Sequence, residues 1–194
     1  MFKATCSWRR LAVVAFASIT AVVTFAASAS AERTLFFEET ASAFWAVPHE
    51  CADGTVVQGT LLVESTRDFE APETEDAEPT VRVQFLAVCP DGTSFRWLGF
   101  LPATITSTEN LKSVTATGSG TVRDFSGATH TVSFNVTWTG IGPVETTVNG
   151  PGSMRRQREA TATGEVIFDG DVLVDGPANH PTRPAPFIRV DTEK

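Results

Sequence analysis

Apolar and polar residues alternate along most of this chain with a period of two, and no helical period of 3.6 residues is sustained. The clearest case is residues 130–139, where Val132, Phe134, Val136 and Trp138 fall on one face and polar residues on the other. Such alternation is typical of strands in an antiparallel sheet that is buried on one face. The chain is therefore predicted to be all-β.

Turn signals such as Asp-Gly and Asn-Gly separate the predicted strands. Eight or nine strands at this close spacing indicate an antiparallel β-barrel of about eight strands, with a two-sheet β-sandwich as the alternative. The strand faces opposite the predicted core carry Thr, Arg, Glu and Lys, which disfavours a barrel that faces lipid. The predicted strands are 34–44, 55–63, 79–89, 94–101, 113–125, 130–139, 144–148, 160–168 and 172–174.

Two short segments nearly repeat each other: Cys-Ala-Asp-Gly-Thr at 51–55 and Cys-Pro-Asp-Gly-Thr at 89–93. Asp-Gly supplies the positive φ angles of a tight hairpin turn. Cys51 and Cys89 are the only cysteines beyond the N-terminal leader, and cysteines of exported chains are typically oxidised. The pattern predicts two neighbouring hairpin ends joined by a Cys51–Cys89 disulfide.

The first 31 residues have the composition of an export signal. A basic start precedes an apolar stretch at 11–27, and Ala29-Ser30-Ala31 fits the small-x-small cleavage rule. We expect a secreted, extracellular protein that is cleaved after Ala31 and has no transmembrane segment afterwards. The predicted organisation is a signal peptide at 1–31, a β-barrel or sandwich domain at 32–175 and a proline-rich extended tail at 176–194. Within the tail, residues 187–190 could dock on the domain or add an edge strand.

The chain is acidic, with a net charge of −8 from 15 Lys and Arg against 23 Asp and Glu. Three of the basic residues lie in the leader, so cleavage would leave 12 against 23 and a net charge of −11. Such a charge repels phosphates and disfavours nucleic acid as a partner. Residues 64–80 include many of the acidic residues and two prolines. This stretch is predicted to be an acidic loop between strands.

The layout resembles the small secreted β-proteins of high-GC Gram-positive (actinobacterial) bacteria. Three threonine- and glycine-rich passages carry the resemblance: Gly-Ser-Gly-Thr-Val at 118–122, Thr-Val-Ser-Phe-Asn-Val-Thr at 131–137 and Ala-Thr-Ala-Thr-Gly at 160–164. The resemblance implies a secreted β-protein. It implies no activity and no functional residue, because the group has no assigned activity.

Few residues offer catalytic or metal-binding chemistry, and no catalytic residue, metal site or cofactor is predicted. His130 opens a strand near Arg123 and Asp124 and could serve as an acid–base group at a barrel mouth. Arg156 and Arg158 share one face of a strand, which favours cross-strand pairs with carboxylates over an anionic ligand at the mouth.

The predicted function is therefore that of a secreted, non-catalytic binding or interaction module. Its partner would be a small apolar ligand in a cavity lined by Trp97, Trp138 and Phe134, or a macromolecule at the surface. A filled core with a threonine-rich face would favour the surface. The alternatives are a small-barrel enzyme of the isomerase or cyclase type that uses His130, and a structural envelope component. The sequence does not predict the oligomeric state.

Overall fold

The computed structural model describes residues 35–71 and 79–193. The predicted signal peptide and its cleavage site lie outside the described residues, as does the middle of the acidic stretch, 72–78. In the described part of the chain, no helix has the length and apolar character needed to cross a membrane.

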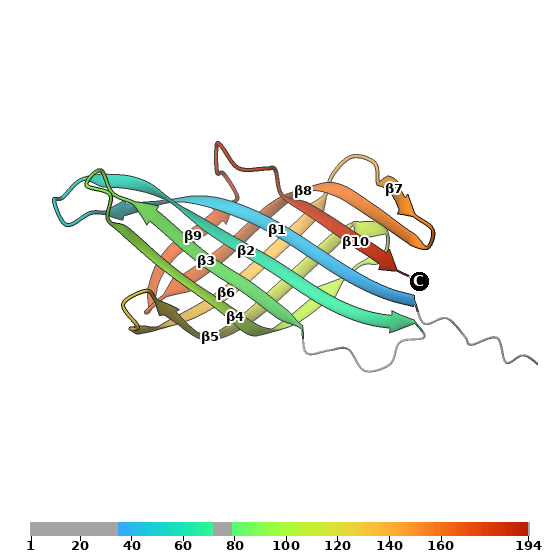
Figure 1. Cartoon of the computed structure of the whole chain (residues 1–194), viewed down its shortest axis with the longest axis horizontal. Helices are drawn as coiled ribbons and strands as arrows, with labels where there is room; N and C mark the ends of the chain where they lie inside the picture. The colour runs from blue at the N-terminus through green and yellow to red at the C-terminus, as the bar shows by residue number, and fades with distance from the viewer. Residues whose placement is uncertain (1–34, 72–78, 194) are drawn as a thin grey trace, which may run out of the picture. The chain divides into compact units, whose positions relative to one another are not determined.

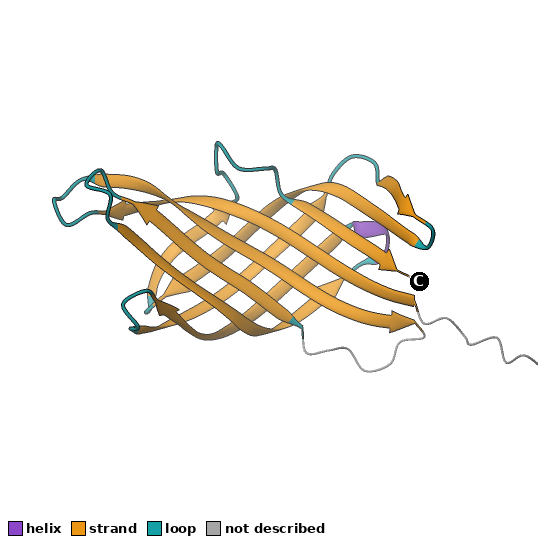
Figure 2. Ribbon diagram, in the orientation of Figure 1, coloured by secondary structure: helices purple, strands orange, loops and turns teal. Residues whose placement is uncertain are grey.

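The described chain forms ten strands that belong to one antiparallel sheet, with a single short 3-10 helix, η1, at Glu109–Leu111 (Figures 1 and 2). The predicted strands all appear, and several are longer than expected. The strands are β1 (Leu35–Glu50), β2 (Val56–Ala71), β3 (Thr80–Val88), β4 (Ser94–Ser107), β5 (Ser113–Asp124), β6 (Thr129–Gly140), β7 (Glu145–Gly150), β8 (Ser153–Phe168), β9 (Asp171–Pro177) and β10 (Phe187–Glu193).

Hydrogen-bonded pairing closes on itself through eight of these strands. The order runs β10-β1-β2-β3-β4-β5-β6-β8, and β8 pairs back onto β10. β7 and β9 pair with β8 beside this ring. The predicted all-β fold with an antiparallel ring of about eight strands is confirmed, and we call the closed ring the barrel.

The end of the segment predicted as an extended tail forms a strand, as the edge-strand alternative allowed, but this strand lies within the barrel and not at an edge. β10 pairs with β1 on one side and with β8 on the other, and Ile188 is fully buried. The proline-rich part before it connects β9 to β10 across the free edge of β1. There the Asn179 side chain accepts a hydrogen bond from the Ala46 N–H, and the His180 N–H donates to the Phe44 carbonyl.

The acidic stretch also begins differently from the predicted loop. β2 continues to Ala71 and pairs with β1 over its whole length, from Glu50↔Val56 to Leu35↔Ala71. Carboxylates such as Glu64 lie on the outward face, where water solvates them, while Ser65 is buried on the inward face. The alternation of the strand thus continues through the acidic residues.

The core lies inside the ring and consists of the alternate residues that the sequence pattern assigned to it. Glycines face large rings across neighbouring strands. A Cβ on Gly59 would collide with the Phe85 ring, and a Cβ on Gly118 would meet the Phe134 ring and the Pro102 carbonyl. The space beside these inward glycines is therefore filled by side chains of neighbouring strands, in line with the dense packing of protein interiors.

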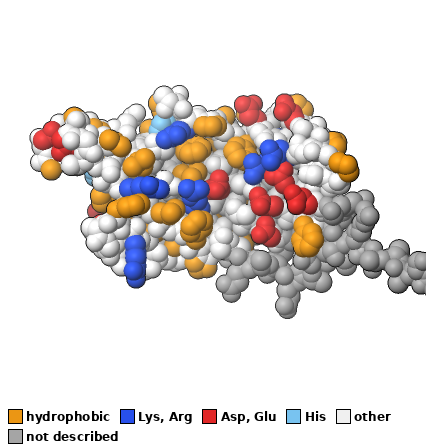
Figure 3. All heavy atoms as spheres, in the orientation of Figure 1, with side chains coloured by type: hydrophobic (Ala, Val, Ile, Leu, Met, Phe, Trp, Pro, Cys, Tyr) orange, Lys and Arg blue, Asp and Glu red, His pale blue; other side chains and the backbone are white. Residues whose placement is uncertain are grey.

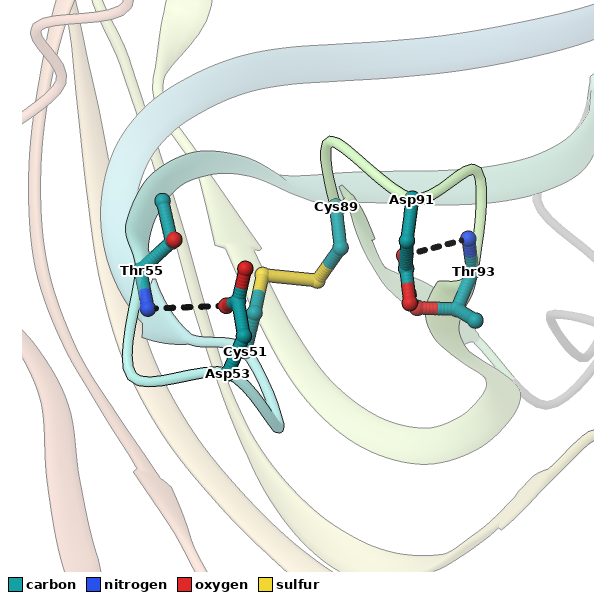
Figure 4. Close-up of a disulfide and its surroundings, with 6 residues drawn as sticks. All are labelled: Cys51, Asp53, Thr55, Cys89, Asp91 and Thr93. Atoms are coloured by element: carbon teal, nitrogen blue, oxygen red, sulfur yellow. Dashed lines mark hydrogen bonds between the residues drawn. A yellow bond between two sulfur atoms is a disulfide. The ribbon is translucent and has the colours of Figure 1, made fainter.

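The predicted disulfide is confirmed, and it joins the β1–β2 and β3–β4 turns (Figure 4). Cys51 and Cys89 have Cα atoms 6.0 Å apart, within the range that a disulfide spans. The two turns are built alike, since the Asp53 and Asp91 carboxylates each accept a hydrogen bond from the N–H two residues later at 2.9 Å. The near-repeat in the sequence thus corresponds to a near-repeat in structure.

Candidate functional site

The three residues predicted to line a cavity, Trp97, Trp138 and Phe134, all lie in the interior and are almost fully buried. The Trp97 ring stacks between Phe85 and Phe168, with ring centroids 5.9 and 5.0 Å away. Phe134 packs over Gly118. Trp97 and Phe134 are thus in contact with protein side chains, which favours a filled interior over an apolar ligand site around them.

A row of aromatic rings, stacked except for the tilted Phe85–Phe95 pair, extends from Trp97 in both directions. Neighbouring rings lie 4.7 to 6.0 Å apart, centroid to centroid. The row ends at two histidines of different strands, so this half of the interior is filled by aromatic side chains. Its members are His49, Phe95, Phe85, Trp97, Phe168 and His130.

His130, the acid–base candidate, lies between two carboxylates at the end of β6. Its Nδ1 is 2.7 Å from Asp169 Oδ2, and its Nε2 is 3.5 Å from Asp124 Oδ2. Hydrogen bonding to Asp169 is the main cause that raises the pKa of His130. Both ring nitrogens face carboxylates, and the contacts join the β5–β6 and β8–β9 turns. Asp169 was not predicted here, although its Asp-Gly turn was.

The remaining chemistry-bearing residues form no metal centre. No group of three or more His, Cys, Asp or Glu side chains in residues 35–71 and 79–193 is placed to hold a metal ion. His180 Nε2 lies 2.9 Å from the Thr60 hydroxyl. The cross-strand ion pair expected of Arg156 and Arg158 is made by Arg155, whose Nε donates to Asp191 at 2.7 Å.

The outward side of β4, β5, β6 and β8 carries a lattice of hydroxyl groups, which we call the hydroxyl face. Cross-strand register aligns Thr106 with Thr115, Thr115 with Thr137 and Thr137 with Thr163. The hydroxyls of Thr115 and Thr137 are 3.1 Å apart. The face comprises Thr104, Thr106, Thr115, Thr117, Ser119, Thr121, Thr131, Ser133, Thr137, Thr139, Thr161 and Thr163.

The ladder between β4 and β5 opens beneath this face. The two strands pair at Leu98↔Arg123 and again from Ala103↔Gly118, with no ladder pair between. Pro102 lies in the opening and has no N–H to donate. Ladder pairing between β4 and β5 is therefore interrupted over residues 99–102 and 119–122.

Two open hollows adjoin the opening, with volumes of about 460 and 400 Å³. Both are bordered by Ser119, and every residue that lines either one is uncharged. Phe100 lies in the opening on β4, is 66% exposed and falls opposite Thr121 when the register of Leu98↔Arg123 is continued. Both hollows are thus lined by hydroxyl-bearing and other uncharged residues, and the exposed Phe100 lies across the ladder from Thr121, which lines one of them.

Such a surface suits a ligand that is rich in hydroxyls and carries no charge. Serine and threonine hydroxyls both donate and accept hydrogen bonds, and an exposed phenyl ring offers an apolar face for a sugar ring. The threonine-rich faces are visible in the alternation of the sequence. The exposure of Phe100 and the interrupted pairing at Pro102 depend on how β4 and β5 align. The chain matches no protein-family profile, no curated protein and no solved structure.

Proposed function

We propose that this protein is a secreted, non-catalytic binding module that docks a neutral polysaccharide chain on its hydroxyl face. The observation that carries the proposal is the uncharged lining of the two hollows beside the exposed Phe100. Charged residues make up 20% of the sequence, so their absence from two adjoining hollows singles out this part of the surface.

The chemistry favours a neutral glycan over other macromolecules. A chain with a net charge of −8 repels anionic polymers, and the hollows offer no cation to hold a phosphate or carboxylate. Aligned hydroxyls about 4.8 Å apart across strands can exchange hydrogen bonds with successive sugar hydroxyls.

The other predicted functions have less support. Trp97 and Phe134 pack against protein side chains, which weakens the case for an apolar carrier that uses the predicted cavity. An isomerase or cyclase would need a free nitrogen on His130, and both nitrogens face carboxylates. No specific observation favours a structural envelope component.

The test is electrophoretic mobility in native gels that contain hydroxyethylcellulose, laminarin or galactomannan, each compared with a gel without glycan. We expect at least one glycan to slow the wild-type protein. Phe100→Ser and Ser119→Glu should restore free mobility, because the first removes the ring and the second places a charge between the hollows. Phe125→Ser and Ser94→Glu are matched controls, since both change exposed residues outside the hollows.

The proposal fails if no glycan slows the wild-type protein, or if the control variants restore mobility as fully as Phe100→Ser and Ser119→Glu. Far-UV circular dichroism of each variant would check that the β structure is intact.

A further inference from the structure

Arg156 and Arg158 lie on the inward side of β8, in the same alternation as the buried Ala160 and Ala162. A Cβ on Gly140 would collide with the Arg158 side chain, which places that side chain at the inner surface of β6. Two guanidinium groups thus share one end of the barrel interior, opposite to the end that the stacked rings fill.

These two arginines have no carboxylate partner within 4.0 Å among the described residues. Their hydrogen bonds are long and go to neutral oxygens: Arg156 donates to Asn110 Oδ1, and Arg158 donates to the Asn110 and Ile141 carbonyls, all at 3.4 Å. Acidic side chains outnumber basic ones in this protein, yet none of those described pairs with these two guanidinium groups. Both groups can therefore still bind an anion.

Glu39 lies in the same row of the barrel wall. It is in register with Val190 of β10, and Val190 is in register with Arg156. Two strand spacings separate the Cα atoms of Glu39 and Arg156 by about 10 Å. On the neighbouring strand β2, away from β10, Glu39 is in register with Arg67.

Glu39 is only 7% exposed, and its Oε1 has no hydrogen-bond partner. Burial is the main cause that raises its pKa, while Arg67 and a hydrogen bond with Ser107 lower it. Trp138 Nε1 is also buried without a partner, and register connects it to this end through Val114 and Ser107. Buried polar atoms are rarely left unsatisfied, so these atoms point to a polar occupant.

We propose that this end of the barrel binds a small hydroxycarboxylate, whose carboxylate lies between Arg156 and Arg158 and whose hydroxyl donates to Glu39. Paired guanidiniums match the geometry of a carboxylate. A hydroxyl also satisfies the buried Glu39 oxygen, which a plain carboxylate cannot do. This site is independent of the hydroxyl face, because it lies on the inward side of the sheet.

The test is isothermal titration of the protein with L-malate and with succinate, which differ by one hydroxyl. We expect malate to bind about 5- to 10-fold more tightly, the effect of one hydrogen bond to a buried group. Arg156→Gln with Arg158→Gln should abolish binding of both acids. Glu39→Gln should reduce the advantage of malate and leave succinate binding in place. The control Arg155→Gln changes the outward neighbour and should leave both affinities unchanged.

The wild-type comparison does not depend on the folding of any variant. Absence of binding by either acid overturns the proposal, as does equal affinity for the two. Loss of binding in Arg155→Gln to the same degree as in the double variant would also overturn it, since the effect would then be one of net charge.

Discussion

At the scale of single residues, the two histidines with altered pKa values lie in opposite environments. His130 is held between Asp124 and Asp169, and hydrogen bonding raises its pKa. His180 packs on Thr60, and burial followed by the charge of Arg183 lowers its pKa. These environments follow from turns and connections that bring together residues far apart in the sequence.

The ring resonances of His130 and His180 should therefore titrate on opposite sides of the ordinary value of 6.5. A pH titration followed by NMR should place the pKa of His130 above 6.5 and that of His180 below it. In Asp169→Asn the pKa of His130 should fall toward the ordinary value, because the substitution removes the carboxylate hydrogen bond that is the main cause of the raised pKa. A pKa for His130 at or below 6.5 in the wild-type protein would contradict the described contacts.

The same contacts predict a pH-dependent contribution to stability. A raised folded-state pKa means that the charged His130 stabilises the fold below the unfolded-state pKa, and that this contribution is lost as pH rises through the folded-state pKa. The pKa values of Asp124 and Asp169 are lowered, so their part is lost only in stronger acid. The difference in melting temperature between the wild-type protein and His130→Gln should be larger at about pH 5 than at about pH 8.5. An equal or larger difference at pH 8.5 would be inconsistent with this account.

At the scale of strands, alternation predicted which residues face inward, but it did not predict where strands end. The acidic composition of residues 64–71 predicts that β2 ends before them, because it disfavours a strand. The long pairing with β1 outweighs that preference. The prolines before β10 predict an extended tail with at most an edge strand at 187–190, whereas β1 and β8 supply partners for this strand on both sides. Strand length depends on the partner strand, which local sequence does not reveal.

The role of β10 predicts a clear difference between two substitutions after residue 176. Ile188→Ala should lower the free energy of unfolding by about 2–5 kcal/mol, because it removes a fully buried side chain from the closed barrel. Thr182→Ala, in the exposed connection before β10, should change it by less than about 0.5 kcal/mol. Chemical denaturation would measure both. Similar, small effects would mean that the segment is a tail after all.

The sequence predicts only part of the candidate site, because the rest depends on how neighbouring strands align. Threonines on outward positions are visible in the alternation of 113–125 and 130–139, so the hydroxyl face follows from the sequence. Its register, the opening of the ladder at Pro102 and the exposure of Phe100 appear only when β4 is aligned with β5. Proline in a strand marks such an opening, and that signal was present in the sequence.

At the scale of the whole barrel, the surface is divided by chemistry. Figure 3 views the side of β1, β2 and β3, where hydrophobic and basic side chains intermingle and acidic side chains gather toward the end at which β10 finishes. The two hollows of the hydroxyl face, which lie mainly on β4, β5 and β6, are lined by uncharged residues only. The proposed neutral partner follows from this division, while the filled aromatic end of the interior leaves the outer surface as the main place for a macromolecule to bind.

The most direct test of this account is NMR mapping of the isotopically labelled protein with a short oligosaccharide of whichever glycan slows it most. We expect amide shifts to change around the hollows, at 99–104, 117–121 and 131–133, and to stay constant in β1 and β10. Shifts confined to β1, β2 and β10, or no change at saturating oligosaccharide, would contradict the claim that the hydroxyl face is the binding surface.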